Sequence, residues 1–335
     1  MITVSVCMIV KNEEAVLARC LDSLKGIGDE IVIADTGSTD RTKEIAARYT
    51  DKVYDFPWNE DFAAARNFVL SKAEMEYIYS ADADEVLDDE NRRKFLEMKQ
   101  TLSPDIEIVQ MRYANQLQYN TTYNFDTELR PKLFRRLRTF RWVDPVHETV
   151  ELTPRVLDSD ITILHKPQNL HSPRDLSILE RAAKSGKMSE RLARMYAKEL
   201  FISGTDADFL AAYPYFEAIL HDENKSLDEV RVAQCVVSRA ARIKNDPDTF
   251  FKAALKNVIG EPCAEVCCEL GAWYFAAGDW EEAATWYYTA ANGVQSELDL
   301  RTSGSIPLLR LAECYLKLGM TDEARECLAR AEQCT

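Results

Sequence analysis

The sequence predicts an α/β domain built on a parallel sheet, followed by an all-helical domain. Over roughly the first hundred residues, apolar runs typical of strands alternate with helical spacing of apolar residues. After Pro167 only helical patterns continue, up to Thr335. A chain of 335 residues also exceeds the size of one typical hydrophobic core. We therefore expect two domains, at residues 1–170 and 171–335.

The α/β domain opens with strands that are separated by helices. Residues 2–10 form a continuous apolar run, as in strands that are covered on both faces. Repeated strand–helix–strand units imply parallel strands joined by right-handed crossovers. The later part of this domain shows strand patterns with few helix signals. The expected strands are residues 2–10, 30–35, 52–55, a run that ends at Asp82, 106–113, 132–136, 147–152 and 161–165. The expected helices are residues 14–25, 38–49 and 61–73. Ser38 or Thr39 is the expected N-cap of the second helix.

Composition excludes some classes of partner. The formal net charge is -15 and the pI is about 4.9, so the chain as a whole repels nucleic acid and anionic membranes. No apolar run approaches the ~20 residues of a membrane-spanning helix, and the first residues lack the features of a signal peptide. We expect a cytoplasmic protein with no nucleic-acid partner and no membrane insertion, and its oligomeric state stays open. Cys263 and Cys267 are spaced like metal ligands, but no second pair of ligands has matching spacing. We therefore expect the nine cysteines to be buried reduced thiols and not a zinc site.

Two stretches of the helical region resemble each other, residues 270–284 and 311–325. They share a glycine expected to end a helix and an alanine expected where two helices cross, namely Gly278 with Ala283 and Gly319 with Ala324. The pattern resembles the tetratricopeptide helix–turn–helix unit, whose period is about 34 residues. The two copies lie further apart than that, with the excess in residues 292–305, and residues 194–220 hold a third, degenerate candidate. A generic helical bundle is the alternative.

Two aspartates directly follow the fourth expected strand. On an extended strand, side chains at i and i+2 face the same way, so Asp82 and Asp84 are expected to share one cation. Oxygen ligands of this kind suit Mg²⁺ or Mn²⁺. Ligands of parallel α/β sheets bind beyond the carboxyl ends of the strands, where Asn12 and Asp35 also fall. Taken alone, an Asp-x-Asp pair is more often a solvated acidic turn.

Four segments at these strand ends carry a family resemblance, residues 11–13, 34–40, 62–67 and 82–85. In order and spacing they resemble family 2 glycosyltransferases with the GT-A fold, a Rossmann-like nucleotide-diphospho-sugar transferase fold, over residues 1–170. The resemblance implies a UDP-sugar donor and a bound Mn²⁺ or Mg²⁺ ion. The residues implied to contact the donor are Asn12, Glu13, Asp35, Arg66 and Asp82. Taken singly, Asp35 also fits a cap, Arg66 a solvated helix residue and Asn12 a turn former.

The second half of the site is expected between residues 130 and 165. Leu-Phe-Arg at residues 133–135 and Val-His-Glu at residues 146–148 resemble one subgroup of the family. That subgroup is similar to lipopolysaccharide-core glucosyltransferases and to sublancin-type peptide S-glycosyltransferases. Pro145 stands where the subgroup usually has glycine, so the geometry of this loop is left open.

The subgroup resemblance implies roles for these later residues. Glu148 is the expected general base, His147 is the second choice, and Asp126 and Glu128 are rivals. The expected metal ligands are Asp82, Asp84 and His165. Arg135 or Arg136 is expected to help hold the diphosphate. The roles of His147, Glu148 and His165 are interchangeable at this stage.

The implied reaction is an inverting, metal-dependent transfer of glucose or N-acetylglucosamine from a UDP-sugar, because one base assists attack from the far side of the anomeric carbon. The expected acceptor is a peptide or protein side chain, held by the helical domain. A cell-envelope saccharide or lipid-linked glycan is the second possibility. A non-catalytic sugar-nucleotide-binding scaffold for the helical repeats is a third, from a different functional class.

Overall fold

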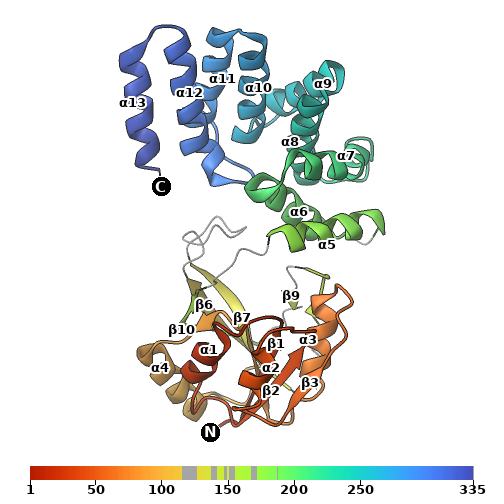
Figure 1. Ribbon diagram of the computed structural model, residues 1–335, viewed down its shortest axis with the longest axis vertical. Coiled ribbons are helices and arrows are strands. Elements are labelled where there is room, and N and C mark those ends of the chain that lie inside the picture. The colour runs from red at the N-terminus through yellow and green to blue at the C-terminus, as the bar shows by residue number, and fades with distance from the viewer. Residues whose placement is uncertain are drawn as a thin grey trace. The chain divides into compact units, whose positions relative to one another are not determined.

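The computed structural model describes residues 1–114, 127–136, 142–146, 149–150, 155–166, 172–186 and 188–334. The chain divides into two compact units, Met1–His171 and Ser172–Thr335 (Figure 1). The first unit combines strands and helices, and the described residues of the second form helices joined by loops, without strands. The expected α/β region followed by an all-helical region is therefore confirmed.

The first unit is organised around a mixed sheet. Within the described residues its strand order is β3-β2-β1-β4-β7-β6-β10-β5. The strands are β1 (Val4–Val10), β2 (Glu30–Asp35), β3 (Val53–Asp55), β4 (Tyr77–Ala81), β5 (Glu85–Val86), β6 (Ile108–Ala114), β7 (Glu128–Arg135) and β10 (Val156–His165). Strands β3, β2, β1 and β4 are parallel, as expected. Beyond β4 the sheet is mixed, because β7 runs antiparallel between β4 and β6.

Four helices connect the strands, α1 (Leu17–Ser23), α2 (Thr42–Ala46), α3 (Phe62–Leu70) and α4 (Asp89–Thr101). Helix α3 begins as predicted, with the side chain of Asp61 accepting a hydrogen bond from the Ala64 N–H at 2.9 Å. The predicted N-cap of α2 is wrong, because this helix begins only at Thr42. The Ser38 hydroxyl instead accepts a hydrogen bond from the Asn12 N–H at 2.9 Å. The chain from Ser38 to Arg41 is therefore a loop that fastens the β1–α1 connection.

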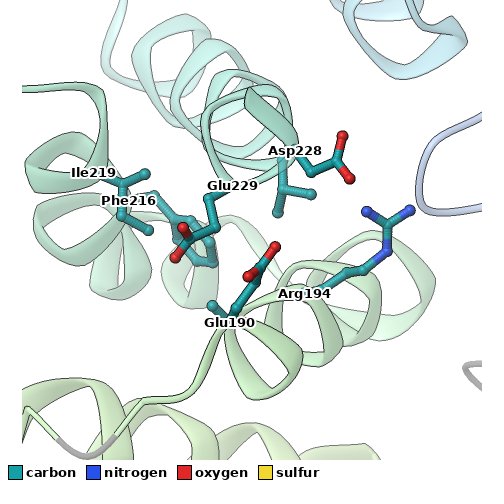
Figure 2. A pocket seen from close by; sticks show the side chains of 8 residues that line it. Glu190, Arg194, Phe216, Ile219, Asp228 and Glu229 are labelled. Carbon is teal, nitrogen blue, oxygen red and sulfur yellow. The ribbon is translucent and has the colours of Figure 1, made fainter. Parts of the chain in front are cut away.

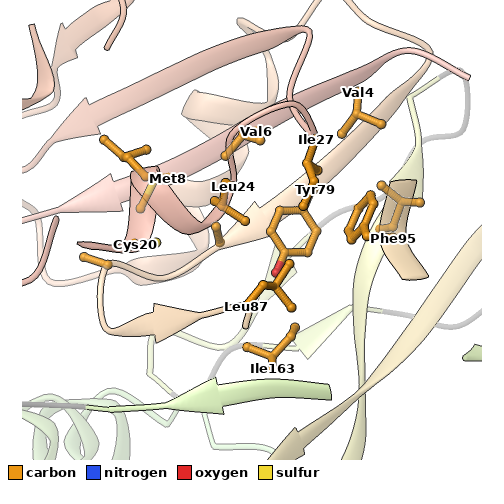
Figure 3. Packing of buried hydrophobic residues seen from close by; sticks show 14 of the residues in the cluster. Val4, Val6, Met8, Cys20, Leu24, Ile27, Tyr79, Leu87, Phe95 and Ile163 are labelled. Carbon is orange, nitrogen blue, oxygen red and sulfur yellow. The ribbon is translucent and has the colours of Figure 1, made fainter. Parts of the chain in front are cut away.

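Strand β1 is covered on both faces, as its continuous apolar run predicts. One face carries Val4, Val6 and Met8 into a cluster with α1 and α4. On the opposite face, Cys7 packs in a second cluster that includes Val69 of α3. In the first cluster the rings of Tyr79 and Phe95 meet edge to face at a centroid distance of 5.3 Å (Figure 3). This packing fixes the end of β4, where the predicted aspartates lie.

The second unit is built from successive helices, α5 (Ser172–Lys184), α6 (Glu190–Ser203), α7 (Asp206–Leu220), α8 (Leu227–Lys244), α9 (Pro247–Ile259), α10 (Ala264–Ala277), α11 (Trp280–Asn292), α12 (Ser305–Lys317) and α13 (Thr321–Glu332), with the 3₁₀ helix η2 (Leu300–Ser303) before α12. Helices α10 to α13 lie side by side in chain order (Figure 1). No described helix has the length and apolarity that crossing a membrane requires.

The two expected repeat copies form the helix pairs α10–α11 and α12–α13. Gly278 and Gly319 have φ values of 81° and 78°, the left-handed conformation that ends a helix at glycine. A Cβ atom on Gly271 would lie 2.8 Å from the ring of Tyr287, so α10 and α11 cross at a position without a side chain. The excess length between the copies lies between the end of α11 and the start of α12, as predicted, and it contains η2.

Candidate active site

Asp82 and Asp84 lie in a tight turn between β4 and β5. The Glu85 N–H donates to the Asp82 carbonyl oxygen at 3.1 Å and closes this turn. The prediction that both aspartates lie on an extended strand is therefore wrong, because the strand ends at Ala81. As a result, the two carboxylates have different partners.

Asp82 is paired with two cationic side chains. Its Oδ1 lies 2.6 Å from Arg66 Nη2, and its Oδ2 lies 3.6 Å from Lys132 Nζ. Burial alone would raise the pKa of Asp82, but the positive charges of Arg66 and Lys132 outweigh it and hold the pKa well below its usual range. Asp82 is therefore a carboxylate at neutral pH.

Arg66 is a buried residue and not a solvated one, because only 7% of it is exposed. Its Nη1 donates to the Ser80 hydroxyl at 2.9 Å, and its guanidinium carbon lies 4.5 Å from the ring centroid of Trp142. Stacking on an aromatic face and forked donation are both properties of arginine that lysine lacks. Helix α3 thus places a fixed positive charge at the end of β4.

Asp84 meets His165 on the other side of the turn. The antiparallel pairing of β5 with β10 sets Glu85 opposite His165, which brings Asp84 Oδ2 to 3.1 Å from His165 Nε2. Both side chains are mostly buried, with 18% and 14% of their surface exposed. Of the three predicted metal ligands, Asp84 and His165 are therefore in contact, whereas Asp82 faces Arg66. One carboxylate oxygen and one imidazole nitrogen at this distance fit a divalent ion such as Mn²⁺.

Several residues of this site were not singled out from the sequence. Lys132 Nζ lies 2.6 Å from Glu85 Oε1, and both side chains are buried. Burial raises the pKa of Glu85, an effect that Lys132 opposes and that the nearby Asp82 charge reinforces. Arg130 lies on β7 together with Lys132, and its guanidinium carbon is 4.0 Å from the ring centroid of Tyr113. The alternation of Arg130 and Lys132 on β7 would have indicated one basic face, had the strand been predicted to begin at Glu128.

The prediction that Arg135 or Arg136 holds the diphosphate is wrong. Because β7 is antiparallel to β4, Arg135 lies opposite Tyr77, the first residue of β4. Asp82 lies five residue steps along the chain from Tyr77, which corresponds to a distance of about 16 Å in an extended strand. Arg135 Nη1 donates to the Pro104 carbonyl and Arg136 Nε to the Met75 carbonyl, each at 2.6 Å. Both arginines thus lie at the end of the sheet where β4 begins, away from Asp82.

Asp35 lies at the carboxyl end of β2 and is almost fully buried. Its Oδ1 accepts hydrogen bonds from the N–H groups of Gly37 and Ser38, both at 2.9 Å. Among the described residues, no group donates a hydrogen bond to its Oδ2, which is also buried. A buried carboxylate oxygen without a donor is costly, so this atom is suited to accept a hydrogen bond from a ligand.

Asn12 and Glu13 hold the neighbouring loop in place. Asn12 adopts a left-handed conformation with φ of 56°, and its Oδ1 accepts a hydrogen bond from the Thr39 N–H at 2.8 Å. The Glu13 N–H donates to the Thr42 hydroxyl at 2.7 Å. These bonds join the loops that follow β1 and β2, beside Asp35. The turn-forming role of Asn12 is therefore present, and its predicted ligand contact stays a prediction.

The expected base lies just beyond a tethered segment. The Asn67 side chain donates to the Trp142 carbonyl at 3.3 Å and accepts from the Trp142 N–H at 3.1 Å. The Phe62 N–H donates to the Pro145 carbonyl at 3.0 Å. Residues 142–146, which include β8 (Trp142–Val143), are therefore held against α3. The predicted bases His147 and Glu148 and their rival Asp126 lie outside the described residues, and the other rival, Glu128, is paired with Arg130.

A small pocket lies in the helical unit, lined by α6, α7 and α8 (Figure 2). Phe216 and Ile219 are among its apolar walls, and Glu190, Asp228 and Glu229 give it acidic walls. Three carboxylates beside one arginine would repel a nucleoside diphosphate. The donor is therefore not expected to bind here.

Comparison with known proteins identifies the families that the two units resemble. Residues 5–150 match the model of glycosyl transferase family 2, and residues 262–334 match that of the tetratricopeptide repeat. A TPR repeat-containing protein of Synechococcus elongatus is 36% identical over 45% of this chain and 36% of its own length. Glycosyltransferase SunS of Bacillus phage SPbeta is 26% identical over 68% of this chain and 55% of its own length. The lipopolysaccharide core biosynthesis glycosyltransferase LpsC of Rhizobium meliloti is 36% identical over 33% of this chain and 41% of its own length.

Solved structures show a more distant likeness. Glucosyl-3-phosphoglycerate synthase from Mycobacterium tuberculosis, in complex with Mn²⁺ and UDP-glucose, superposes with a TM-score of 0.40 at 15% identity, over 56% of this chain and 80% of its own. TarS of S. aureus superposes with a TM-score of 0.37 at 14% identity, over 87% of this chain and 56% of its own. The chain matches between about one third and just over half of the length of the curated relatives named above. Residues 5–150 therefore form a family 2 glycosyltransferase domain, and residues 262–334 carry tetratricopeptide repeats.

Proposed function

We propose that this chain is an inverting, metal-dependent glycosyltransferase that moves glucose or N-acetylglucosamine from a UDP-sugar to a peptide or protein side chain. The observation that carries the proposal is the turn after β4, where the Arg66–Asp82 ion pair lies beside the Asp84–His165 contact. Fixed positive charge and a set of metal-ligating atoms thus occur at the carboxyl end of parallel strands. This is where α/β sheets bind their ligands.

Asp84 Oδ2 and His165 Nε2 are the atoms that would hold Mn²⁺ or Mg²⁺. A divalent ion bound there would neutralise charge on the departing nucleoside diphosphate. Two protein ligands are sufficient, because such ions commonly take phosphate oxygens and waters as their remaining ligands. Asp82, whose Oδ1 is occupied by Arg66, would mainly orient that guanidinium.

The donor would be held by groups on three sides. Arg66 and Lys132 would supply the positive charge for the diphosphate. They would take the role that the sequence assigned to Arg135 or Arg136. The Oδ2 of Asp35, which lacks a donor among the described residues, would accept a hydrogen bond from the nucleoside. Asn12 and Glu13 would shape the adjoining wall of the pocket.

Glu148 is the proposed base that takes the proton of the acceptor, with His147 as the second choice. Val146 is buried within the segment that is tethered to α3. Trp142, at the start of the same segment, has its ring centroid 4.5 Å from the guanidinium carbon of Arg66. The segment that precedes Glu148 in the sequence therefore begins beside the proposed donor site, which supports this choice of base.

The acceptor is proposed from the helical region. Stacked helical repeats form extended surfaces that suit a peptide or protein segment. The resemblance to peptide-glycosylating members of the family points the same way. The name of the relative LpsC supports the second candidate, a saccharide of the cell envelope.

Donor hydrolysis tests the proposal. Purified protein with Mn²⁺ should slowly release UDP from at least one member of a panel of UDP-sugars, and Asp84→Ala should abolish this release. Asp89→Asn is a matched control, because Asp89 is an exposed acid at the start of α4. Binding of UDP-sugars without any turnover, with any candidate acceptor, would instead identify a scaffold. Glu148→Gln should reduce transfer severely and leave UDP affinity nearly unchanged.

A further inference from the structure

Two buried cysteines face each other in the helical unit, outside the proposed active site. Cys235 lies on α8, and Cys263 immediately precedes α10. Their sulfur atoms are 3.4 Å apart, and neither residue has exposed surface. A disulfide bond is about 2.05 Å long, so the two sulfurs would need to approach by only about 1.4 Å.

We propose that Cys235 and Cys263 are a site of reversible oxidation, at which a low-molecular-weight disulfide such as oxidised glutathione converts the two thiols into an intramolecular disulfide. One thiolate attacks the oxidant and forms a mixed disulfide, and the second thiolate displaces the remaining glutathione. The protein loses two S–H bonds and gains one S–S bond. The two electrons and two protons leave on two molecules of reduced glutathione.

A metal site is the competing interpretation, because the carboxylate of Glu265 lies close to both sulfurs. That carboxylate already accepts several hydrogen bonds from the chain around η2. Its Oε1 accepts hydrogen bonds from the Leu298 N–H at 2.8 Å, the Asp299 N–H at 3.0 Å and the Thr302 hydroxyl at 3.0 Å. Glu265 therefore fastens the chain around η2, and a third ligand is lacking among the described residues. Two sulfurs alone make a poor site for zinc, which takes four ligands.

The oxidant can reach the pair through the exposed connection between α9 and α10. Gly260, Glu261 and Pro262 are exposed, and Pro262 directly precedes Cys263. Arg231 holds this connection, with its Nη1 2.5 Å from Glu261 Oε2. The hydrogen bond to Cys263 and burial both raise the pKa of Cys235, so the Cys235 thiolate rarely forms while the connection is closed. Oxidation is therefore expected to follow local opening of this connection.

The experiment incubates the full chain with oxidised glutathione, unfolds it in urea, blocks the remaining thiols with N-ethylmaleimide, and maps tryptic peptides by mass spectrometry. We expect two of the nine cysteines to escape alkylation and one non-reduced peptide pair to link Cys235 with Cys263. Cys235→Ser should abolish this link, and Cys334→Ser, which removes an exposed thiol, should leave it unchanged. Glu261→Gln should speed its formation severalfold, because it releases the connection from Arg231.

Because the link is mapped in the unaltered protein, the test does not depend on how well the Cys235→Ser variant folds. Complete alkylation of both cysteines after unfolding, or links formed only through Cys334, would overturn the proposal. So would native mass spectrometry that showed a retained metal ion protecting the two thiols under reducing conditions.

Discussion

Arg66 and Asp82 form an ion pair between α3 and the turn after β4, with Nη2 and Oδ1 2.6 Å apart. The arginine is buried, whereas about a third of the Asp82 side chain is exposed. The guanidinium is held from a second direction by the Ser80 hydroxyl. Such an arrangement fixes the direction of a positive charge before a ligand arrives, which reduces the cost of ordering it on binding.

We predict that Arg66→Lys weakens UDP binding at least tenfold and leaves the fold intact. Lysine keeps the charge but loses both the forked donation to Ser80 and Asp82 and the stacking on Trp142. Arg66→Ala should in addition lower the free energy of unfolding of the first unit by about 3 kcal/mol, because it leaves Asp82 without its main partner. Calorimetric titration with UDP and denaturation with urea measure the two effects. Wild-type UDP affinity in the lysine variant would contradict this role.

The contact between Asp84 and His165 leads to a second prediction. Asp84→Asn and His165→Ala should each weaken Mn²⁺ binding at least tenfold, since each removes one of the two proposed ligand atoms. Asp82→Asn should weaken Mn²⁺ binding less, because the Asp82 carboxylate is directed at Arg66. Electron paramagnetic resonance of free Mn²⁺ measures this binding without any turnover.

Asp89→Asn serves as the control for the loss of an acidic side chain, because Asp89 is highly exposed and pairs only weakly with Arg92. Equal loss of Mn²⁺ affinity in the Asp82 and Asp84 variants would show that both aspartates bind the ion. An unchanged Mn²⁺ titration in His165→Ala would remove this histidine from the ligand set.

The sequence predicts the position of this site better than its internal pairing. Asp35, Asp82 and Asp84 are correctly placed at strand ends, because apolar runs mark where each strand stops. A turn at Asp82 is only the alternative interpretation of the Asp-x-Asp pair in the sequence, because alanine at position 83 adds no turn signal. The error on Arg135 has a different cause. Which end of β7 meets the site depends on strand direction, and direction is set by pairing with β4 and not by local sequence.

Contacts between distant segments were likewise out of reach of sequence spacing. Cys263 was compared with Cys267, four residues away, whereas its neighbour in space is Cys235 on another helix. The burial of Lys132 against Glu85 follows from the pairing of β7 with β4, because Glu85 lies just after β4 although it is 47 residues from Lys132 in the chain. The helical repeats were visible because their glycine and alanine positions recur at a fixed offset.

The tether between Asn67 and Trp142 provides a third prediction. Asn67→Ala removes both hydrogen bonds to the Trp142 backbone, whereas Asn67→Asp can still accept from the Trp142 N–H but cannot donate to its carbonyl. If this tether positions Glu148, kcat for transfer should fall in the order wild type, Asp variant, Ala variant. UDP affinity should stay within about twofold, because Asn67 is not a proposed donor ligand. A parallel loss of UDP affinity would instead indicate that the segment shapes the donor pocket.

The crossing of α10 and α11 gives a fourth prediction, whose sign is decisive. Alanine in place of glycine inside a helix normally stabilises it by about 0.5–1 kcal/mol. At Gly271 the added methyl group would lie 2.8 Å from the buried ring of Tyr287, so we expect Gly271→Ala to destabilise the helical unit by about 1–3 kcal/mol. In a Tyr287→Leu background the same change should cost less, since the ring is absent. Urea denaturation of all four proteins measures the coupling, and an equal cost of Gly271→Ala in both backgrounds would show that this ring does not set the requirement for glycine.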